Sequence, residues 1–134
     1  MRIFSSNIMI NPQFDSIGRQ FVEHYYNTFD ANRSTLGPLY AEQSLLSFEG
    51  EQFQGVSGIV NKLVSLPFQK IKHELVRADC QPNPQNNGVI VFVVGKLFVD
   101  DSQSPLMFAQ VFHLAPNPSG GYFCLNDLFR LNTC

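Results

Sequence analysis

The sequence has no tryptophan, few basic residues and no long apolar run, and each shortage argues against a class of protein. Lys and Arg number only 9 among 134 residues, are not clustered, and face 11 acidic residues, giving a net charge of −2. Nucleic-acid-binding proteins usually carry a basic patch, so no nucleic-acid partner is expected. No run approaches the roughly 18 apolar residues of a membrane span, so no membrane-spanning helix is predicted.

Cysteine is also scarce, with three residues, Cys80, Cys124 and Cys134. None lies in a CxxC pair or at the Cys/His spacing of a zinc site, so neither a metal nor a cofactor is predicted. The N-terminal MRIFSSNIMI has one basic residue and an apolar run interrupted by Ser and Asn, which makes a poor signal peptide. An odd cysteine count without such a signal fits a soluble protein of a reducing compartment.

The stretch from residue 48 to residue 73 carries the clearest local signals. Glu49 and Gly50 interrupt an apolar alternation, and Gly permits the positive φ of a tight hairpin turn. Ser57 is the predicted N-cap of an amphipathic helix, which Pro67 ends. The apolar positions of that helix are Ile59, Val60, Leu63 and Val64. One helix is therefore expected between two strands.

The region before this stretch predicts a long helix. Asn11 is the expected N-cap, with Pro12 at the first helical position. Apolar residues then recur at helical spacing: Phe14, Ile17, Phe21, Val22, Tyr25 and Phe29. A short second helix carrying Leu36, Leu39 and Tyr40 is expected around Gly37–Pro38.

The region after it predicts four strands, at residues 68–80, 89–99, 106–115 and 122–131. In the first strand, the alternation of apolar residues shifts by one position after Leu75, which predicts a β-bulge near that residue. The second and third are apolar on both faces, so both faces of the sheet need cover.

The predicted order is α-α-β-β-α-β-β-β-β, an α+β domain over residues 12–134 with a poorly ordered extension at residues 1–11. We expect a strongly bent, mostly antiparallel sheet with helices packed on its concave face and a cone-shaped pocket between the layers. Nothing in one chain covers the opposite apolar face, so a homodimer that pairs through the sheets is predicted.

Six segments resemble the nuclear transport factor 2 family, in the family's order and at its separations. They are FVEHYYNTFD, FEGEQFQG, IVNKL, SLPFQKIKH, VVGKL and NDLFRL. The resemblance runs from about Phe14 to Leu131. It implies a non-enzymatic homodimer that binds the GTPase Ran in its GDP form and the phenylalanine-glycine repeats of nucleoporins. Such a carrier takes Ran-GDP into the nucleus, and is expected in cytoplasm and nucleus with enrichment at the nuclear pore.

The resemblance also implies a Ran site. An aromatic residue of Ran enters the cone-shaped cavity while acidic residues at its mouth pair with basic residues of Ran. The acids fall on Glu49 and Asp100, followed by Asp101 and Ser102, where the family commonly keeps another acid one step further on. The cavity wall and mouth are assigned to Phe48, Leu66, Lys70, Ile71, His73, Met107, Leu128 and Phe129.

Repeat binding is implied for Phe14 on the first helix and Arg130 near the dimer seam. The family often has tryptophan at the positions of Phe14 and Phe48. Phenylalanine keeps the apolar face and loses the indole N–H donor and some area.

Two other functions share this fold. An isomerase or dehydratase would use His73, Asp127 or Tyr40 as a general acid or base in the pocket. No two titratable residues lie at a spacing that indicates such a pair. A dimeric adaptor for an export factor would not need the acidic residues Glu49, Asp100 and Asp101. Without the resemblance, Glu49 is interpreted as a solvated turn residue and Phe48, Met107 and Phe129 as plain core.

Overall fold

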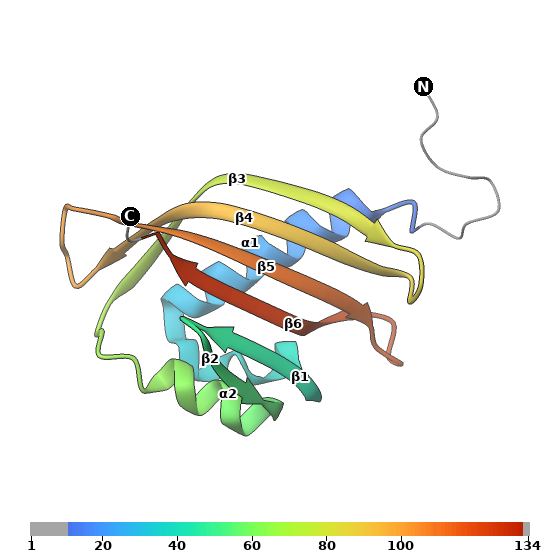
Figure 1. Cartoon of the computed structure of the whole chain (residues 1–134), viewed down its shortest axis with the longest axis horizontal. Helices are drawn as coiled ribbons and strands as arrows, with labels where there is room; N and C mark the ends of the chain where they lie inside the picture. The colour runs from blue at the N-terminus through green and yellow to red at the C-terminus, as the bar shows by residue number, and fades with distance from the viewer. Residues whose placement is uncertain (1–10, 133–134) are drawn as a thin grey trace.

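The computed structural model describes residues 11–132, which form a bent six-stranded sheet with helices on one side (Figure 1). The elements are α1 (Phe14–Asn32), the 3₁₀ turns η1 (Arg33–Thr35) and η2 (Gly37–Leu39), β1 (Tyr40–Phe48), β2 (Glu51–Gln54), α2 (Gly55–Val64), β3 (Ile71–Asn83), β4 (Gly88–Val99), β5 (Leu106–Pro116) and β6 (Tyr122–Leu131). The strand order is β2-β1-β6-β5-β4-β3, and only the β1–β6 pair is parallel. The predicted α+β class and mostly antiparallel sheet are confirmed.

Helix α1 begins later than the sequence predicts. Asn11 accepts a hydrogen bond at Oδ1 from the backbone N–H of Gln13, so its side chain stabilises a turn before the helix, and Gln13 occupies the N-cap position. Of the predicted apolar face, Phe21, Val22, Tyr25 and Phe29 are buried, whereas Phe14 and Ile17 are half-buried. Tyr26, which the prediction left out, is buried too, and the helix packs on β3 and β4. The predicted second helix is instead the pair of 3₁₀ turns, because Gly37–Pro38 limits helical continuation and Tyr40 already pairs in β1.

Helix α2 begins at Gly55, two residues before the predicted cap Ser57. Gly55 has φ +83°, a conformation that turns the chain directly from β2 into the helix, so Gln54 takes the N-cap position and Ser57 lies inside the helix. The helix ends at Val64 ahead of Pro67, and it packs on β1.

Two predicted backbone features are confirmed. Glu49 and Gly50 both have positive φ, 51° and 89°, and form the two-residue turn between the paired residues Phe48 and Glu51. In β3 the register with β4 shifts between Leu75 and Arg77, which is the expected bulge.

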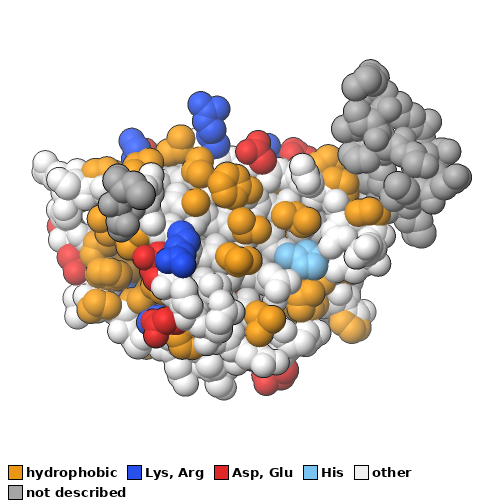
Figure 2. Space-filling model, viewed as in Figure 1, with side chains coloured by type: hydrophobic (Ala, Val, Ile, Leu, Met, Phe, Trp, Pro, Cys, Tyr) orange, Lys and Arg blue, Asp and Glu red, His pale blue; other side chains and the backbone are white. Residues whose placement is uncertain are grey.

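The two faces of the sheet differ in cover. Val89, Val91 and Val93 of β4 point toward the helices and are fully buried. The opposite surface, here called the outer face, carries the cross-strand rows Phe92–Val111–Leu128 and Val94–Ala109–Arg130. Phe92 is 43% exposed and Leu128 50% exposed. Figure 2 views this face and shows hydrophobic side chains gathered over the middle strands.

The predicted N-terminal extension lies outside the described residues except for Asn11. That residue is buried, and its Nδ2 donates to the hydroxyl of Tyr122 and the carbonyl of Asn87. Within residues 11–132, neither helix has the length and apolar character needed to cross a membrane.

Candidate binding cavity

An apolar cavity of about 100 Å³ lies between the sheet and the helices. Its wall is formed by Tyr25, Phe29, Leu46, Phe48, Leu63, Leu66, Phe68, Ile71, His73, Leu97, Val99, Leu106, Gln110, Asp127, Phe129 and Leu131. Figure 1 shows why these residues meet. The β1–β2 turn, the segment before β3, the β4–β5 loop and the end of β6 all gather at the left end of the molecule.

Five of the predicted site residues line this cavity: Phe48, Leu66, Ile71, His73 and Phe129. Phe48 and Phe129 stack with ring centroids 4.7 Å apart and planes within 6°. The prediction that Met107 and Leu128 line the cavity is wrong. Alternate residues of a strand point to opposite faces, and both side chains lie on the outer face, 40% and 50% exposed. Leu106 takes the place expected for Met107.

His73 lies deeper than the mouth position that the sequence predicts. Its side chain is only 3% exposed, and its ring stacks on Tyr26 at 4.5 Å. The Asp30 carboxylate accepts from the backbone N–H of His73 at 2.8 Å and lies 2.6 Å from Nδ1. Asp30 therefore fixes the ring against the end of α1. Lys70, in contrast, is exposed and does not line the cavity, and its Nζ lies 3.3 Å from Asp101 Oδ2.

A buried polar network forms the floor of the cavity around Asp127. Its Oδ2 accepts from the hydroxyl of Tyr40 at 2.7 Å and of Tyr25 at 3.3 Å, and its Oδ1 accepts from Gln110 Nε2 at 2.7 Å. The Gln110 carbonyl in turn accepts from the hydroxyl of Tyr26 at 2.7 Å. Burial raises the pKa of Asp127 to about 6, and the bonds from Gln110, Tyr40 and Tyr25 oppose that rise.

The network contains side chains that could form a catalytic site, but their polar atoms are already hydrogen-bonded to one another. Burial, and then the Asp127 carboxylate, raise the pKa of Tyr25 and Tyr40 well above the usual tyrosine range, so both stay protonated donors. In the part of the chain described, no buried side-chain nitrogen or oxygen lacks a partner. At about 100 Å³ the cavity is well below the roughly 300 Å³ of the smallest usual ligand pockets. Its size suits one inserted side chain better than a substrate.

Glu49 lies at the mouth of the cavity. It follows Phe48, and its Oε1 accepts from the backbone N–H of Leu131, so it is tied to two lining residues. Its backbone N–H donates to the carbonyl of Phe129 at 3.1 Å. Among residues 11–132, Glu49 Oε2 takes part in no further hydrogen bond, and this oxygen can receive a donor from outside.

Asp100 and Asp101 form a second left-handed turn directly after the lining residue Val99, with φ 51° and 64°. The Asp100 side chain is exposed, but its Oδ1 is already engaged and accepts from the backbone N–H groups of Gln69 at 2.8 Å and Lys70 at 2.9 Å. Asp101 is exposed and contacts the exposed ammonium group of Lys70. The two acids therefore differ in how freely they can meet a partner.

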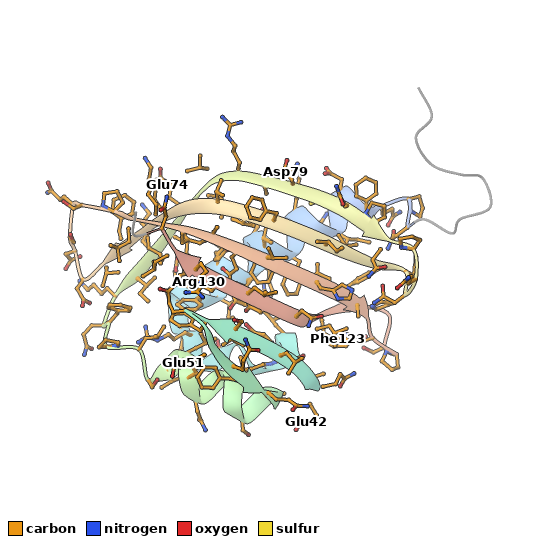
Figure 3. All side chains as sticks on the ribbon, in the orientation of Figure 1. Glu42, Glu51, Glu74, Asp79, Phe123 and Arg130 are labelled. Atoms are coloured by element: carbon orange, nitrogen blue, oxygen red, sulfur yellow. The ribbon has the colours of Figure 1, made fainter. Side chains whose placement is uncertain are left out.

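Phe14 and Arg130 do not come together within one chain. Phe14 is half-buried at the start of α1, which Figure 1 places at the right end of the molecule. Arg130 is exposed near the end of β6, at the left in Figure 3. Its guanidinium lies over Gly50, where an added Cβ would be 3.3 Å from Nη2.

Sequence reasoning missed Arg33. This residue follows α1 in η1, and its guanidinium donates to three backbone carbonyls: Leu63 at 2.8 Å, Leu66 at 3.1 Å and Phe68 at 2.6 Å. The side chains of those three residues line the cavity. A lone arginine directly after a long helix and before Gly-Pro was the available signal. Within the described part of the chain, no cluster of three or more His, Cys, Asp or Glu residues could hold a metal ion.

A family model described as the nuclear transport factor 2 (NTF2) domain matches residues 17–131. Nuclear transport factor 2B of Arabidopsis thaliana is 51% identical over 118 residues, covering 88% of this chain and 94% of that protein. The solved structure of nuclear transport factor 2 from Cryptosporidium parvum superposes with a TM-score of 0.88 at 58% identity, covering 94% of this chain and 100% of that one.

A more distant solved structure shares only the fold. A putative scytalone dehydratase from Novosphingobium aromaticivorans superposes with a TM-score of 0.74 at 12% identity, over 89% of this chain and 84% of that one. The cone-shaped fold thus serves proteins of unrelated function, and the residues of the cavity must decide between them.

Proposed function

The chain belongs to the nuclear transport factor 2 family, and from this premise we propose that it is a homodimeric carrier that binds Ran-GDP and takes it into the nucleus. Its curated relatives at about 50% identity are named nuclear transport factors, which are transport carriers and not enzymes. A role in nuclear transport follows from that kinship.

The observation that carries the proposal is an apolar cavity for one side chain with carboxylates at its mouth. An aromatic ring that enters between Leu66, Phe68 and Phe129 loses its contact with water, which contributes ~1.5–3 kcal/mol. The cavity offers an incoming ring almost no polar surface, because the groups of the floor bond to one another. An apolar ring is therefore a better occupant than a polar side chain.

The carboxylates supply the second part of the recognition. Glu49 Oε2 and the exposed Asp101 are available for basic residues on either side of the inserted ring. The Lys70–Asp101 ion pair is exposed, so its exchange for a partner's cation costs little. Charges at the edge of an interface raise specificity and association rate more than affinity. Only the nucleotide state of Ran that presents ring and cations together would fit.

The outer face supports the homodimer. Its apolar rows are exposed in the single chain, and a second copy related by a twofold axis would cover them. Leu128 and Met107, which do not line the cavity, lie on this face. Binding of phenylalanine-glycine repeats is proposed for Phe14 and for Arg130 near the seam, with the carrier distributed between cytoplasm and nucleus and concentrated at the pore.

The rival functions have less support. For an isomerase or dehydratase, Asp127 and Tyr40 do lie in contact and His73 lines the same cavity. Their polar atoms are bonded to one another or to Asp30, and the cavity is too small for an ordinary substrate. No observation favours the export adaptor.

The test is a binding assay with Ran loaded with GDP or with GTP. We expect retention of Ran-GDP only. Glu49→Gln keeps a carbonyl oxygen for the Leu131 N–H and removes the charge, so it should slow association and weaken Ran-GDP binding about tenfold, a difference of ~1.4 kcal/mol. Glu42→Gln is the matched control, since Glu42 is exposed at the far end of β1 (Figure 3). Equal binding of both nucleotide states, or of neither, would refute the carrier.

Repeat binding is tested separately. Phe14→Ala should weaken binding of a phenylalanine-glycine repeat peptide and leave Ran-GDP binding unchanged, because α1 begins at the opposite end from the cavity mouth. Repeat binding that survives this substitution would remove Phe14 from the proposed surface.

A further inference from the structure

The segment that connects α2 to β3, residues 65–70, forms one side of the cavity mouth and has no regular secondary structure. It is called here the α2–β3 loop. Leu66 and Phe68 point from it into the cavity. The N–H groups of Ser65 and Leu66 still donate to carbonyls of the last turn of α2, but beyond Leu66 the loop backbone pairs with no strand or helix. The position of the two side chains therefore depends on what else holds the loop.

Arg33 holds the carbonyl side of this loop. A guanidinium is a planar fork of N–H donors, and here it reaches the carbonyls of Leu66 and Phe68 from Nη2 and that of Leu63 from Nε. Leu63 lies in the last turn of α2, where carbonyls lack intrahelical partners and a cation is favourable. A single side chain thus joins the end of α1, the end of α2 and the loop.

Asp100 holds the opposite side. Its carboxylate accepts from the N–H groups of Gln69 and Lys70, and its own N–H donates to the Lys70 carbonyl at 2.9 Å. The loop is therefore fixed between a cation that binds its carbonyls and an anion that binds its amides. The contacts from Asp100 lie at the β3 end of the loop, whereas those from Arg33 lie at Leu66 and Phe68.

We propose that Arg33 is a positioning residue for the cavity: it keeps Leu66 and Phe68 where an incoming ring requires them, without itself touching the partner. This inference rests on the proposed function, since the cavity is taken to bind Ran-GDP. It adds a residue outside the cavity wall to the determinants of affinity. It also assigns Asp100 a share in shaping the mouth, beside any contact with the partner.

The expected effect follows from the fraction of time that the loop is correctly placed. If removal of the guanidinium leaves the binding conformation populated about a tenth of the time, the apparent affinity falls about tenfold. Lysine keeps the charge but offers a single ammonium in place of the fork, so Arg33→Lys should lie between wild type and Arg33→Gln.

The experiment measures Ran-GDP binding by calorimetry for wild type, Arg33→Gln, Arg33→Lys and the control Arg19→Gln. Arg19 is on α1 and also donates to a backbone carbonyl, that of Ala78 at 3.1 Å, but lies away from the cavity. Arg33→Gln should weaken binding about tenfold and Arg19→Gln should not. Amide hydrogen exchange without Ran should be faster at Leu66 and Phe68 in Arg33→Gln only, because their N–H groups donate to the carbonyls of Leu63 and Leu66, which Arg33 also binds.

Two readouts separate positioning from direct contact and from general destabilisation. Leu66→Ala removes part of the wall that Arg33 positions, so Arg33→Gln should have a much smaller effect in that background than in wild type. The salt dependence of the association rate should change no more in Arg33→Gln than in Arg19→Gln, because a residue that does not meet the partner alters steering only through the overall charge. Additive effects, or a larger change in Arg33→Gln than in Arg19→Gln, would overturn the proposal.

The failure of this inference is distinct from failure of the carrier function. If wild type does not retain Ran-GDP, the proposed function fails, while the exchange experiment still tests the role of Arg33 in the loop. If wild type binds and Arg33→Gln binds equally well, the carrier stands and the positioning role is wrong. If neither Arg33 variant folds, Arg33 is required for the fold itself, and the positioning role is likewise rejected.

Discussion

The carboxylate at the floor of the cavity should make the protein less stable as the pH rises from about 4 to about 6. Asp127 is 1% exposed and surrounded by Tyr25, Tyr40 and Gln110, and its pKa is about 6 in the folded chain against an ordinary value of 3.8. Within that interval the folded state holds a proton that the unfolded state has released. The free energy of unfolding therefore falls with rising pH.

The size of this effect follows from the pKa difference. Each pKa unit corresponds to ~1.4 kcal/mol, so a difference of about 2 units makes the contribution of Asp127 ~3 kcal/mol less favourable at pH 7 than at pH 4. Asp127→Asn removes the titration. If the Gln110 amide turns over, its Oε1 can accept from the new side-chain amide and its Nε2 can donate to the Tyr26 hydroxyl. The network can then remain satisfied without a charge.

The assay is urea unfolding of wild type and Asp127→Asn at several pH values from 4 to 7, at one fixed protein concentration because a dimer's stability depends on it. Relative to wild type, the variant should gain up to ~3 kcal/mol between pH 4 and pH 7. Asp79→Asn, at an exposed position of β3, is the control and should show no comparable change (Figure 3). A difference between Asp127→Asn and wild type that does not vary with pH would refute the reasoning.

Two further predictions concern the outer face and the β1–β2 turn. Leu128→Glu places a charge among the exposed apolar rows, so light scattering should detect a folded monomer; Val64→Glu, on α2 at 48% exposure, should remain dimeric. A dimeric Leu128→Glu would place the interface elsewhere. Gly50→Ala forces a side chain into φ +89° beside Arg130 and should lower the free energy of unfolding by ~1–2 kcal/mol in urea titration, and an unchanged value would contradict the strain.

The elements could be predicted from the sequence where one strong local signal governs them. The Glu49–Gly50 turn, the bulge after Leu75 and the four long strands depend on glycine chemistry and on alternation, both of which are visible in the chain. Helix starts were less predictable. Asn11 and Ser57 are both good cap residues, but the first stabilises a turn and the second follows a glycine that had already started the helix.

Part of the cavity wall was predicted: Phe48, Leu66, Ile71, His73 and Phe129 line it, whereas Phe68 and Leu106, which also line it, were not assigned to the site. Met107 and Leu128 were misplaced although alternation with Phe108 and Phe129 already puts them on the other face. Arg33 could not be found from the sequence, because its effect depends on backbone carbonyls of a loop that is 33 to 35 residues away in the chain. The bonds from the Asp100 carboxylate to the loop amides are likewise a product of the tertiary fold.

The position of β6 has a consequence for synthesis on the ribosome. This strand is the last element of the described chain, yet it lies between β1 and β5 in the sheet. Until Tyr122–Leu131 has left the exit tunnel, the β1–β2 hairpin has no sheet to join and the floor around Asp127 does not exist. During translation, therefore, the aromatic residues of α1 are exposed for longer, because the sheet that buries them is incomplete. Assistance by chaperones is then more important during translation than afterwards.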